Sequence, residues 1–118
     1  MKNKILLIFF ILLLSIQAQA KPVTHIVLIW LDNSLSQEKI TKIIDDTKQL
    51  AKINYVKSLK VGRAIHSTRK IVDDSFTFGI VMEFTDIKSM NKYLMDVRHV
   101  NYVQQLKPVI KKLLVYDF

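Results

Sequence analysis

The sequence predicts an α+β fold, with a four-stranded antiparallel sheet that carries helices on one face. Three observations support this class. Strand-like and helix-like segments follow one another in the order β-α-β-β-α-(α)-β, which is the split βαβ, ferredoxin-like arrangement. The first strand-like segment is apolar on both faces, as expected in the middle of a covered sheet. The 118-residue chain has no cysteine, so disulfides cannot provide an alternative framework.

The N-terminus has the pattern of a secretory signal peptide. Two lysines precede an unbroken apolar run over 5–14, and the small-x-small sequence Ala18-Gln19-Ala20 lies just before Lys21. The apolar run is shorter than the ~20 residues that span a bilayer, so a membrane anchor is the weaker alternative. We therefore expect residues 1–20 to be removed and no membrane insertion after cleavage.

The remaining residues, 21–118, number 98 and suffice for one small domain. Removal of the signal lowers the net charge from +8 to +6, and the basic residues are dispersed along the chain. Nucleic-acid binding favours a clustered basic face, so we expect no nucleic-acid partner. The expected localisation is exported: periplasmic if the source is Gram-negative, and otherwise secreted.

Two elements open the predicted domain. Residues 23–31 are almost wholly apolar and rich in β-branched side chains, which is typical of a strand covered on both faces. Ser34 or Ser36 can cap a helix that extends to about residue 53. One apolar stripe recurs at helical spacing in it: Ile40, Ile43, Ile44, Thr47 and Ala51.

The next two strands are predicted over 55–65 and 76–84. In the first of them, Gly62 indicates a bulge or a close backbone contact. A polar loop around residues 66–70 separates the two strands. Alternation in the second strand would place five large apolar side chains on one face: Phe76, Phe78, Ile80, Met82 and Phe84.

Two helices and a last strand complete the order. Thr85 or Asp86 can cap a second helix, and a short third helix follows that Pro108 limits. Residues 112–118 are expected to form the final strand.

The face of the sheet without helices would be an exposed apolar patch in a monomer. Ile26, Leu28 and Trp30 alternate on that face of the first strand, and Val81 joins them from the third. Packing against the same face of a second copy would cover the patch by two-fold symmetry. The sequence therefore predicts a homodimer.

No standard catalytic signature is present. With two glycines in the chain there is no phosphate-binding loop, and without cysteine there is no thiol nucleophile. The three histidines are not at i, i+4 spacing, so we expect no metal site and no cofactor. The remaining constellation is His25, Tyr93 and His99.

Short motifs along nearly all of 21–118 carry a family resemblance. They are His25-Ile26-Val27-Leu28, Val61-Gly62-Arg63, Met82-Glu83-Phe84, Tyr93-Leu94 with Arg98-His99, and Val115-Tyr116-Asp117-Phe118. Through these motifs the chain resembles the stress-responsive α/β-barrel (Dabb) family. The resemblance implies a ferredoxin-like, dimeric α+β barrel, and a role in stress response.

The resemblance also implies candidate site residues. One branch of the family looks like polyketide cyclases, in which a tyrosine and a histidine perform acid–base work and match Tyr93 and His99. The strand-one histidine of that branch matches His25. Two departures stand out: Phe78 occupies the place of a further pocket histidine, and Asp96-Val97 replaces the usual His-Pro.

Three functions remain open. The first is binding of a small, apolar organic ligand between sheet and helices, with His25, Phe78, Ile80 and Ile44 lining the pocket. The second is a cyclase or lyase in which His99 is the general base and Tyr93 its partner. The third is a purely structural envelope stress protein, in which the two histidines and the tyrosine only stabilise the fold.

Overall fold

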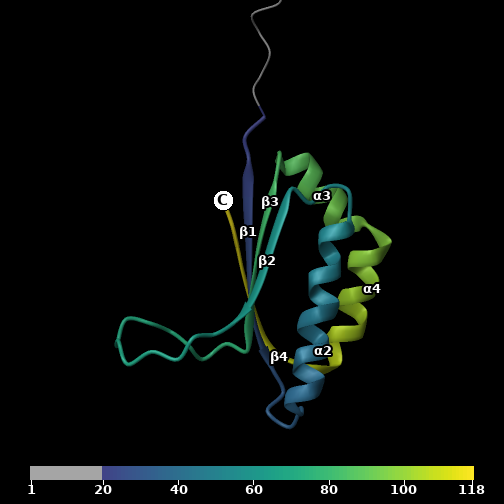
Figure 1. Ribbon diagram of the computed structural model, residues 1–118. Helices are drawn as coiled ribbons and strands as arrows, with labels where there is room; N and C mark the ends of the chain where they lie inside the picture. Colours follow the sequence, from purple (N-terminus) through teal and green to yellow (C-terminus); the bar gives the residue numbers. More distant parts are fainter. Residues whose placement is uncertain (1–19) are drawn as a thin grey trace, which may run out of the picture.

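The computed structural model describes residues 20–118, so the predicted signal peptide lies outside the described residues except for Ala20. The described part is one sheet with a layer of helices on one face (Figure 1). The elements in chain order are β1 (Val23–Leu31), α2 (Gln37–Lys48), β2 (Ser58–Arg63), β3 (Phe78–Phe84), α3 (Ile87–Met95), α4 (Val97–Leu106) and β4 (Ile110–Asp117). Short 3-10 helices follow α2 (Gln49–Lys52) and α4 (Lys107–Val109).

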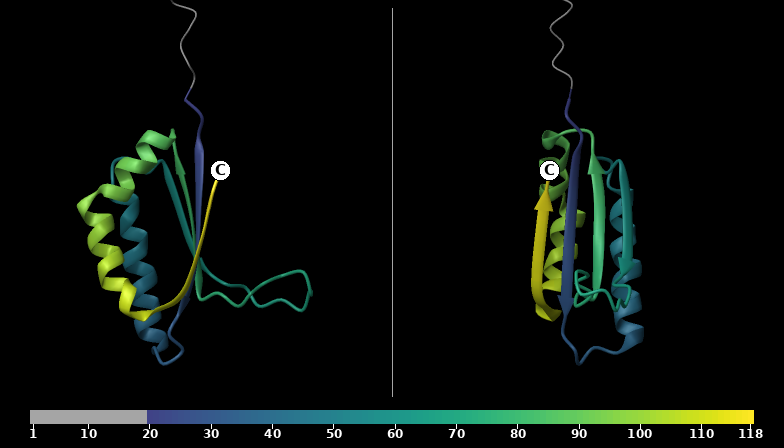
Figure 2. Two further views of the ribbon diagram at one scale, coloured as in Figure 1. Left: turned by 180° about the vertical axis from the view of Figure 1, so that it is seen from behind. Right: turned by 90° about the vertical axis from the view of Figure 1, so that its left-hand side faces the viewer.

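The four strands are ordered β2-β3-β1-β4, and every neighbouring pair is antiparallel. Figure 2 shows the strands side by side, with the helices behind them. This is the ferredoxin-like α+β fold, and the predicted class is confirmed. The predicted bounds of the first strand are those of β1.

Strand alternation places the core between the sheet and the helices. Every second residue of β1 is buried on the helix side, and the residues between them are half-buried on the opposite face. The buried set is Val23, His25, Val27, Ile29 and Leu31. We call the opposite face, which carries no helix, the open face of the sheet.

Side-chain caps start the three helices. Ser36 accepts a hydrogen bond from the Lys39 backbone amide, Asp86 caps α3, and Asp96 caps α4. The first helix ends at Lys48 and continues as a 3-10 turn, so its regular part is shorter than expected. Pro108 lies in the 3-10 turn after α4, where a proline is tolerated near a helix start.

Two expectations about the middle strands are wrong. The β2–β3 register runs without interruption through Gly62, and a Cβ built there would meet nothing within 4 Å. The irregularity lies instead between Trp30 and Leu31, where β1 pairs with β4. Phe76 precedes β3, and its ring lies against Gly79 on the open face, so it does not share the buried face of Phe78.

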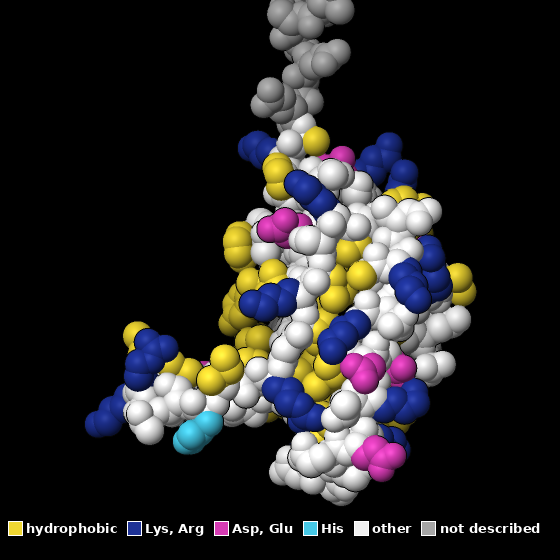
Figure 3. Space-filling view, viewed as in Figure 1, with side chains coloured by type: hydrophobic (Ala, Val, Ile, Leu, Met, Phe, Trp, Pro, Cys, Tyr) yellow, Lys and Arg dark blue, Asp and Glu magenta, His cyan; other side chains and the backbone are white. Residues whose placement is uncertain are grey.

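The open face is apolar through most of its width. Its members include Ile26, Leu28, Trp30, Phe76, Val81, Leu114 and Tyr116. Figure 3 shows hydrophobic side chains gathered on this side of the sheet, whereas Lys and Arg are scattered over the helices, the edge of the sheet and the connection between β2 and β3. Within residues 20–118, no helix is long and apolar enough to cross a membrane.

Candidate functional site

An apolar cavity of about 220 Å³ lies between the sheet and the helices. Its floor comes from β1, β3 and β4, and its roof from α3, α4 and the turn after α2. The lining consists of His25, Val27, Ile29, Leu50, Ile80, Met82, Tyr93, Leu94, His99, Tyr102, Val103, Leu106, Ile110, Leu113 and Val115. Val103, Leu113 and Val115 are partly exposed, so they form an apolar rim between α4 and β4.

The three polar residues predicted from the sequence converge in this cavity. The Tyr93 ring lies near both histidines, with its centroid 4.5 Å from that of His99 and 6.5 Å from that of His25. Phe84 packs beneath Tyr93, 5.2 Å between centroids. These residues come from β1, α3, α4 and β3, so the folded sheet and both helices are needed to assemble them.

His25 is held by a residue at the other end of the chain. It pairs with Asp117 across the β1–β4 ladder, and its Nδ1 donates to the Asp117 carboxylate over 2.5 Å. Backbone hydrogen bonds in both directions between Thr24 and Phe118 fix the end of β4 beside it. Because Nδ1 carries the proton, the neutral His25 ring has its lone pair on Nε2.

His99 is oriented in the same way by a backbone group. Its Nδ1 donates to the Leu94 carbonyl over 3.0 Å, which leaves the lone pair of the neutral ring on Nε2. Burial lowers the pKa of His99 below its usual 6.5, and the nearby His25 adds to this effect. His99 is therefore a neutral imidazole at pH 7, which is the form that can accept a proton.

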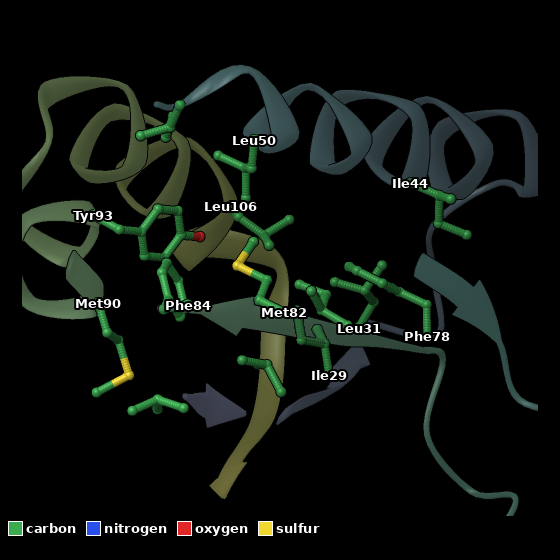
Figure 4. Packing of buried hydrophobic residues seen from close by; sticks show 14 of the residues in the cluster. Ile29, Leu31, Ile44, Leu50, Phe78, Met82, Phe84, Met90, Tyr93 and Leu106 are labelled. Carbon is green, nitrogen blue, oxygen red and sulfur yellow. The ribbon is translucent and has the colours of Figure 1, made fainter. Parts of the chain in front are cut away.

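Tyr93 is nearly inaccessible to solvent, with 2% of its surface exposed. Burial raises the pKa of its hydroxyl well above 10, so the group stays protonated and can donate a hydrogen bond. Figure 4 shows the hydroxyl oxygen directed toward Leu106 and Met82, two residues of the cavity lining. The cavity thus contains the Tyr93 hydroxyl as a hydrogen-bond donor and, with its ring next to that of Tyr93, the neutral imidazole of His99.

Asp96 fixes the turn that separates Tyr93 from His99. Its carboxylate accepts from the Arg98 backbone amide and from the Arg98 guanidinium, at 2.9 and 3.0 Å. These hydrogen bonds lower the pKa of Asp96 to about 2. Asp96 therefore stands at the start of α4 as an ionised helix cap.

The predicted apolar wall of the site is only partly in place. Ile80 lines the cavity, but Phe78 and Ile44 do not, although both are buried. Figure 4 shows Phe78 and Ile44 together at the far end of the core from Tyr93. Strand alternation correctly places Phe78 on the face of β3 that the helices cover. Its position at the start of the strand, however, places it under α2 and away from the cavity.

Sequence reasoning missed two polar residues near the site. Asp117 belongs to the C-terminal motif Val115-Tyr116-Asp117-Phe118, but the sequence does not link it to His25. Their contact depends on the register of β1 against β4. Tyr102 lines the cavity from α4, and its hydroxyl shares a 2.6 Å hydrogen bond with the buried Thr47 of α2. Neither contact has a local sequence signal, because each joins residues that are far apart in the chain.

The comparisons with known proteins identify the family. The profile of the Dabb family, described as a stress responsive A/B barrel domain, matches residues 23–118. The chain therefore belongs to the stress-responsive α/β-barrel family, which confirms the resemblance seen in its motifs. No curated protein matches the chain.

No cluster of three or more His, Asp or Glu that could hold a metal ion occurs in residues 20–118.

Solved structures share the fold. A hydroxynitrile lyase from Passiflora edulis has a TM-score of 0.75 and 23% identity, covering 83% of this chain and 92% of its own. A Dabb family protein from Mesorhizobium loti has a TM-score of 0.64 and 26% identity, with coverage of 82% and 94%. A dimeric ferredoxin-like protein of unknown function from Thermobifida fusca has a TM-score of 0.70 and 16% identity, with coverage of 88% and 95%.

The lowered pKa of His99 predicts a pH dependence of stability. As the pH falls, the ring in the unfolded chain takes up its proton near 6.5, before the buried ring does. Protonation then favours the unfolded chain, so the melting temperature should fall between pH 7.5 and 5.5. The carboxylates with lowered pKa values titrate below this window. Thermal melts should show a weaker pH dependence for His99→Gln, and an unchanged slope would contradict this assignment.

Proposed function

We propose that the protein binds a small, largely apolar organic molecule in the cavity beside His99. The observation that carries this proposal is the meeting of Tyr93, His99 and His25 at a cavity whose other lining is apolar apart from Tyr102. A purely structural role would be served by a filled core. Sites for small organic ligands commonly combine an apolar lining with a few polar groups that fix the orientation of the ligand.

The volume limits the ligand. An engineered cavity of about 150 Å³ binds benzene, and typical drug-sized pockets begin near 300 Å³. A cavity of about 220 Å³ therefore suits a molecule of one substituted ring or of similar size. The partly exposed rim between α4 and β4 provides an entrance for it.

The polar groups favour a ligand with one oxygen function. The Tyr93 hydroxyl can donate to a carbonyl or phenol oxygen, and the neutral His99 ring can accept a proton from a hydroxyl. The apolar lining beyond them would contact the hydrocarbon part. A charged molecule would lose its hydration without a full counter-charge and should bind poorly.

Thermal melts of wild type and His99→Ala with a panel of aromatic and polyketide-like compounds test this proposal. We expect at least one compound to raise the melting temperature of the wild type, and the rise to be smaller in the variant. Under a structural role, the same substitution leaves the Leu94 carbonyl without its donor and costs about 1–3 kcal/mol of stability. Marked destabilisation with no compound shifting the wild type would reject the binding site.

An enzyme of the cyclase or lyase class is the second candidate. The observation that favours it is the neutral His99 ring 4.5 Å from the Tyr93 ring, which gives a base and a hydrogen-bond donor in one apolar site. Similarity to the hydroxynitrile lyase agrees with this class but concerns the fold. Turnover of a bound compound that is lost in His99→Ala and reduced in Tyr93→Phe would support catalysis, whereas binding without turnover would support the first candidate.

We further propose that the protein is a homodimer whose open faces pack together. The apolar open face has no covering element within residues 20–118, and several structural neighbours are described as dimeric. A domain of this size without disulfides also gains stability from a partner.

We infer from the N-terminal pattern that the chain is exported. If a signal peptidase cleaves after Ala20, the intact mass of the exported protein should correspond to a chain that begins at Lys21. Retention of residues 1–20 in the purified native protein would contradict this inference.

A further inference from the structure

The connection from β2 to β3 forms a long arm. Residues 64–77 leave the sheet after Arg63 and return at Phe78. Figures 1 and 2 show this arm projecting from the open face, in the direction opposite to the helices. It therefore extends into the space that a second copy would occupy if the open faces pack together.

Side-chain hydrogen bonds hold the arm in shape. Asp74 accepts from the Ser67 backbone amide at 2.9 Å and contacts the His66 ring at 3.0 Å, which ties the outgoing half to the returning half. At the base, the Trp30 indole donates to the Ser75 hydroxyl over 3.0 Å. The arm is thus joined to the open face near the C-terminal end of β1, and it is braced across its own width.

The arm carries two of the most exposed large apolar side chains among the described residues. Ile65 is 84% exposed and Ile71 is 90% exposed. Both are isoleucines on a braced segment, and the rest of the described chain leaves them almost uncovered. Two such residues beside an apolar sheet face point to a protein partner.

The dimensions favour a second copy of this chain as that partner. Packed sheets lie about 10 Å apart. A segment of 14 residues that goes out and returns can reach roughly 20 Å, at about 3.3 Å per extended residue. The arm would therefore pass the facing sheet and lie along its side, and two-fold symmetry would give two such contacts in each dimer.

We propose that the β2–β3 arm of each subunit clasps the other subunit, with Ile65 and Ile71 buried against the partner. This inference rests on the proposed homodimer and adds a second contact region to the sheet faces. Each arm would contact the side of the partner's sheet, beyond the two faces that pack together.

Site-specific cross-linking tests the contact directly. The chain has no cysteine, so Ile71→Cys carries a single thiol that can be labelled with benzophenone maleimide. Illumination at low micromolar protein should give a covalent species of twice the subunit mass. Ile87→Cys is the matched control, because Ile87 is also exposed but lies in the helix layer away from the open face. It should give little or none of this species.

A dissociation constant tests the energetic role. Sedimentation of Ile65→Lys/Ile71→Lys should show the dimer weakened by at least about 100-fold, since four isoleucines per dimer lose apolar burial. The control, Ile87→Lys/Met95→Lys, makes the same change at two exposed residues of α3 and should leave the dimer unchanged. Circular dichroism should be native for both variants.

The possible outcomes distinguish a failure of the arm contact from a failure of the proposed dimer. A wild-type dimer without the Ile71 cross-link, and with an unchanged dissociation constant in the arm variant, overturns the clasp and leaves the dimer in place. A wild-type monomer at micromolar concentration overturns both. Cross-links that form only within one chain would show that the arm folds back on its own subunit, which also overturns the clasp.

Discussion

Leu28→Glu is expected to convert the proposed dimer to a monomer or to prevent folding. Leu28 lies at the centre of the open face, with Gly79 and Leu114 as its cross-strand neighbours. A carboxylate there would be buried without a partner in the packed faces, which costs several kcal/mol. Sedimentation equilibrium and light scattering measure the result.

Leu28 is a better position for this test than Trp30. The Lys112 ammonium lies 4.5 Å from the centre of the Trp30 ring, so a glutamate at residue 30 could find a counter-charge. Ile87→Glu is the control, because it introduces the same charge at an exposed apolar residue in the helix layer. A Leu28→Glu protein that remains a dimer would show that the open face is not the interface.

Val103→Trp is expected to abolish the proposed ligand binding while leaving the fold intact. Val103 lines the cavity from α4 and is 41% exposed, so an indole can extend from the rim into the cavity without replacing a fully buried side chain. The larger ring would occupy the space of the ligand. Compounds that raise the wild-type melting temperature should have no effect on the variant.

Val100→Trp provides a matched control for this experiment. Val100 lies on the same helix and has the same 41% exposure, but it is not part of the cavity lining. It should keep the wild-type response to each compound. Equal responses of the two variants would place binding outside this cavity.

Much of the fold followed from the sequence because local patterns determine it. The two-sided apolar pattern of residues 23–31 identified β1 with its bounds, and Ser36 and Asp86 marked helix starts. The errors occurred where tertiary contacts decide. Phe76 continues the apolar alternation of β3, yet it precedes the strand and packs on the open face.

The candidate site was predictable to the extent that the family motifs include its residues. Those motifs singled out His25, Tyr93 and His99, and the fold brings these three to one cavity. The apolar wall was harder to predict, because alternation gives the face of a residue but not its position under a helix; this explains why Phe78 lies outside the lining. Asp117 could not be paired with His25 without the β1–β4 register.

Native mass spectrometry of the protein purified from its own host shows whether the cavity carries a ligand. We expect a dimer that carries a small organic molecule, and no such adduct on Val103→Trp purified in the same way. A compound identified from the adduct should also raise the melting temperature of the ligand-free protein. A bare wild-type mass, together with no binding of any compound in the aromatic and polyketide-like panel, would contradict the proposal that this cavity binds a ligand.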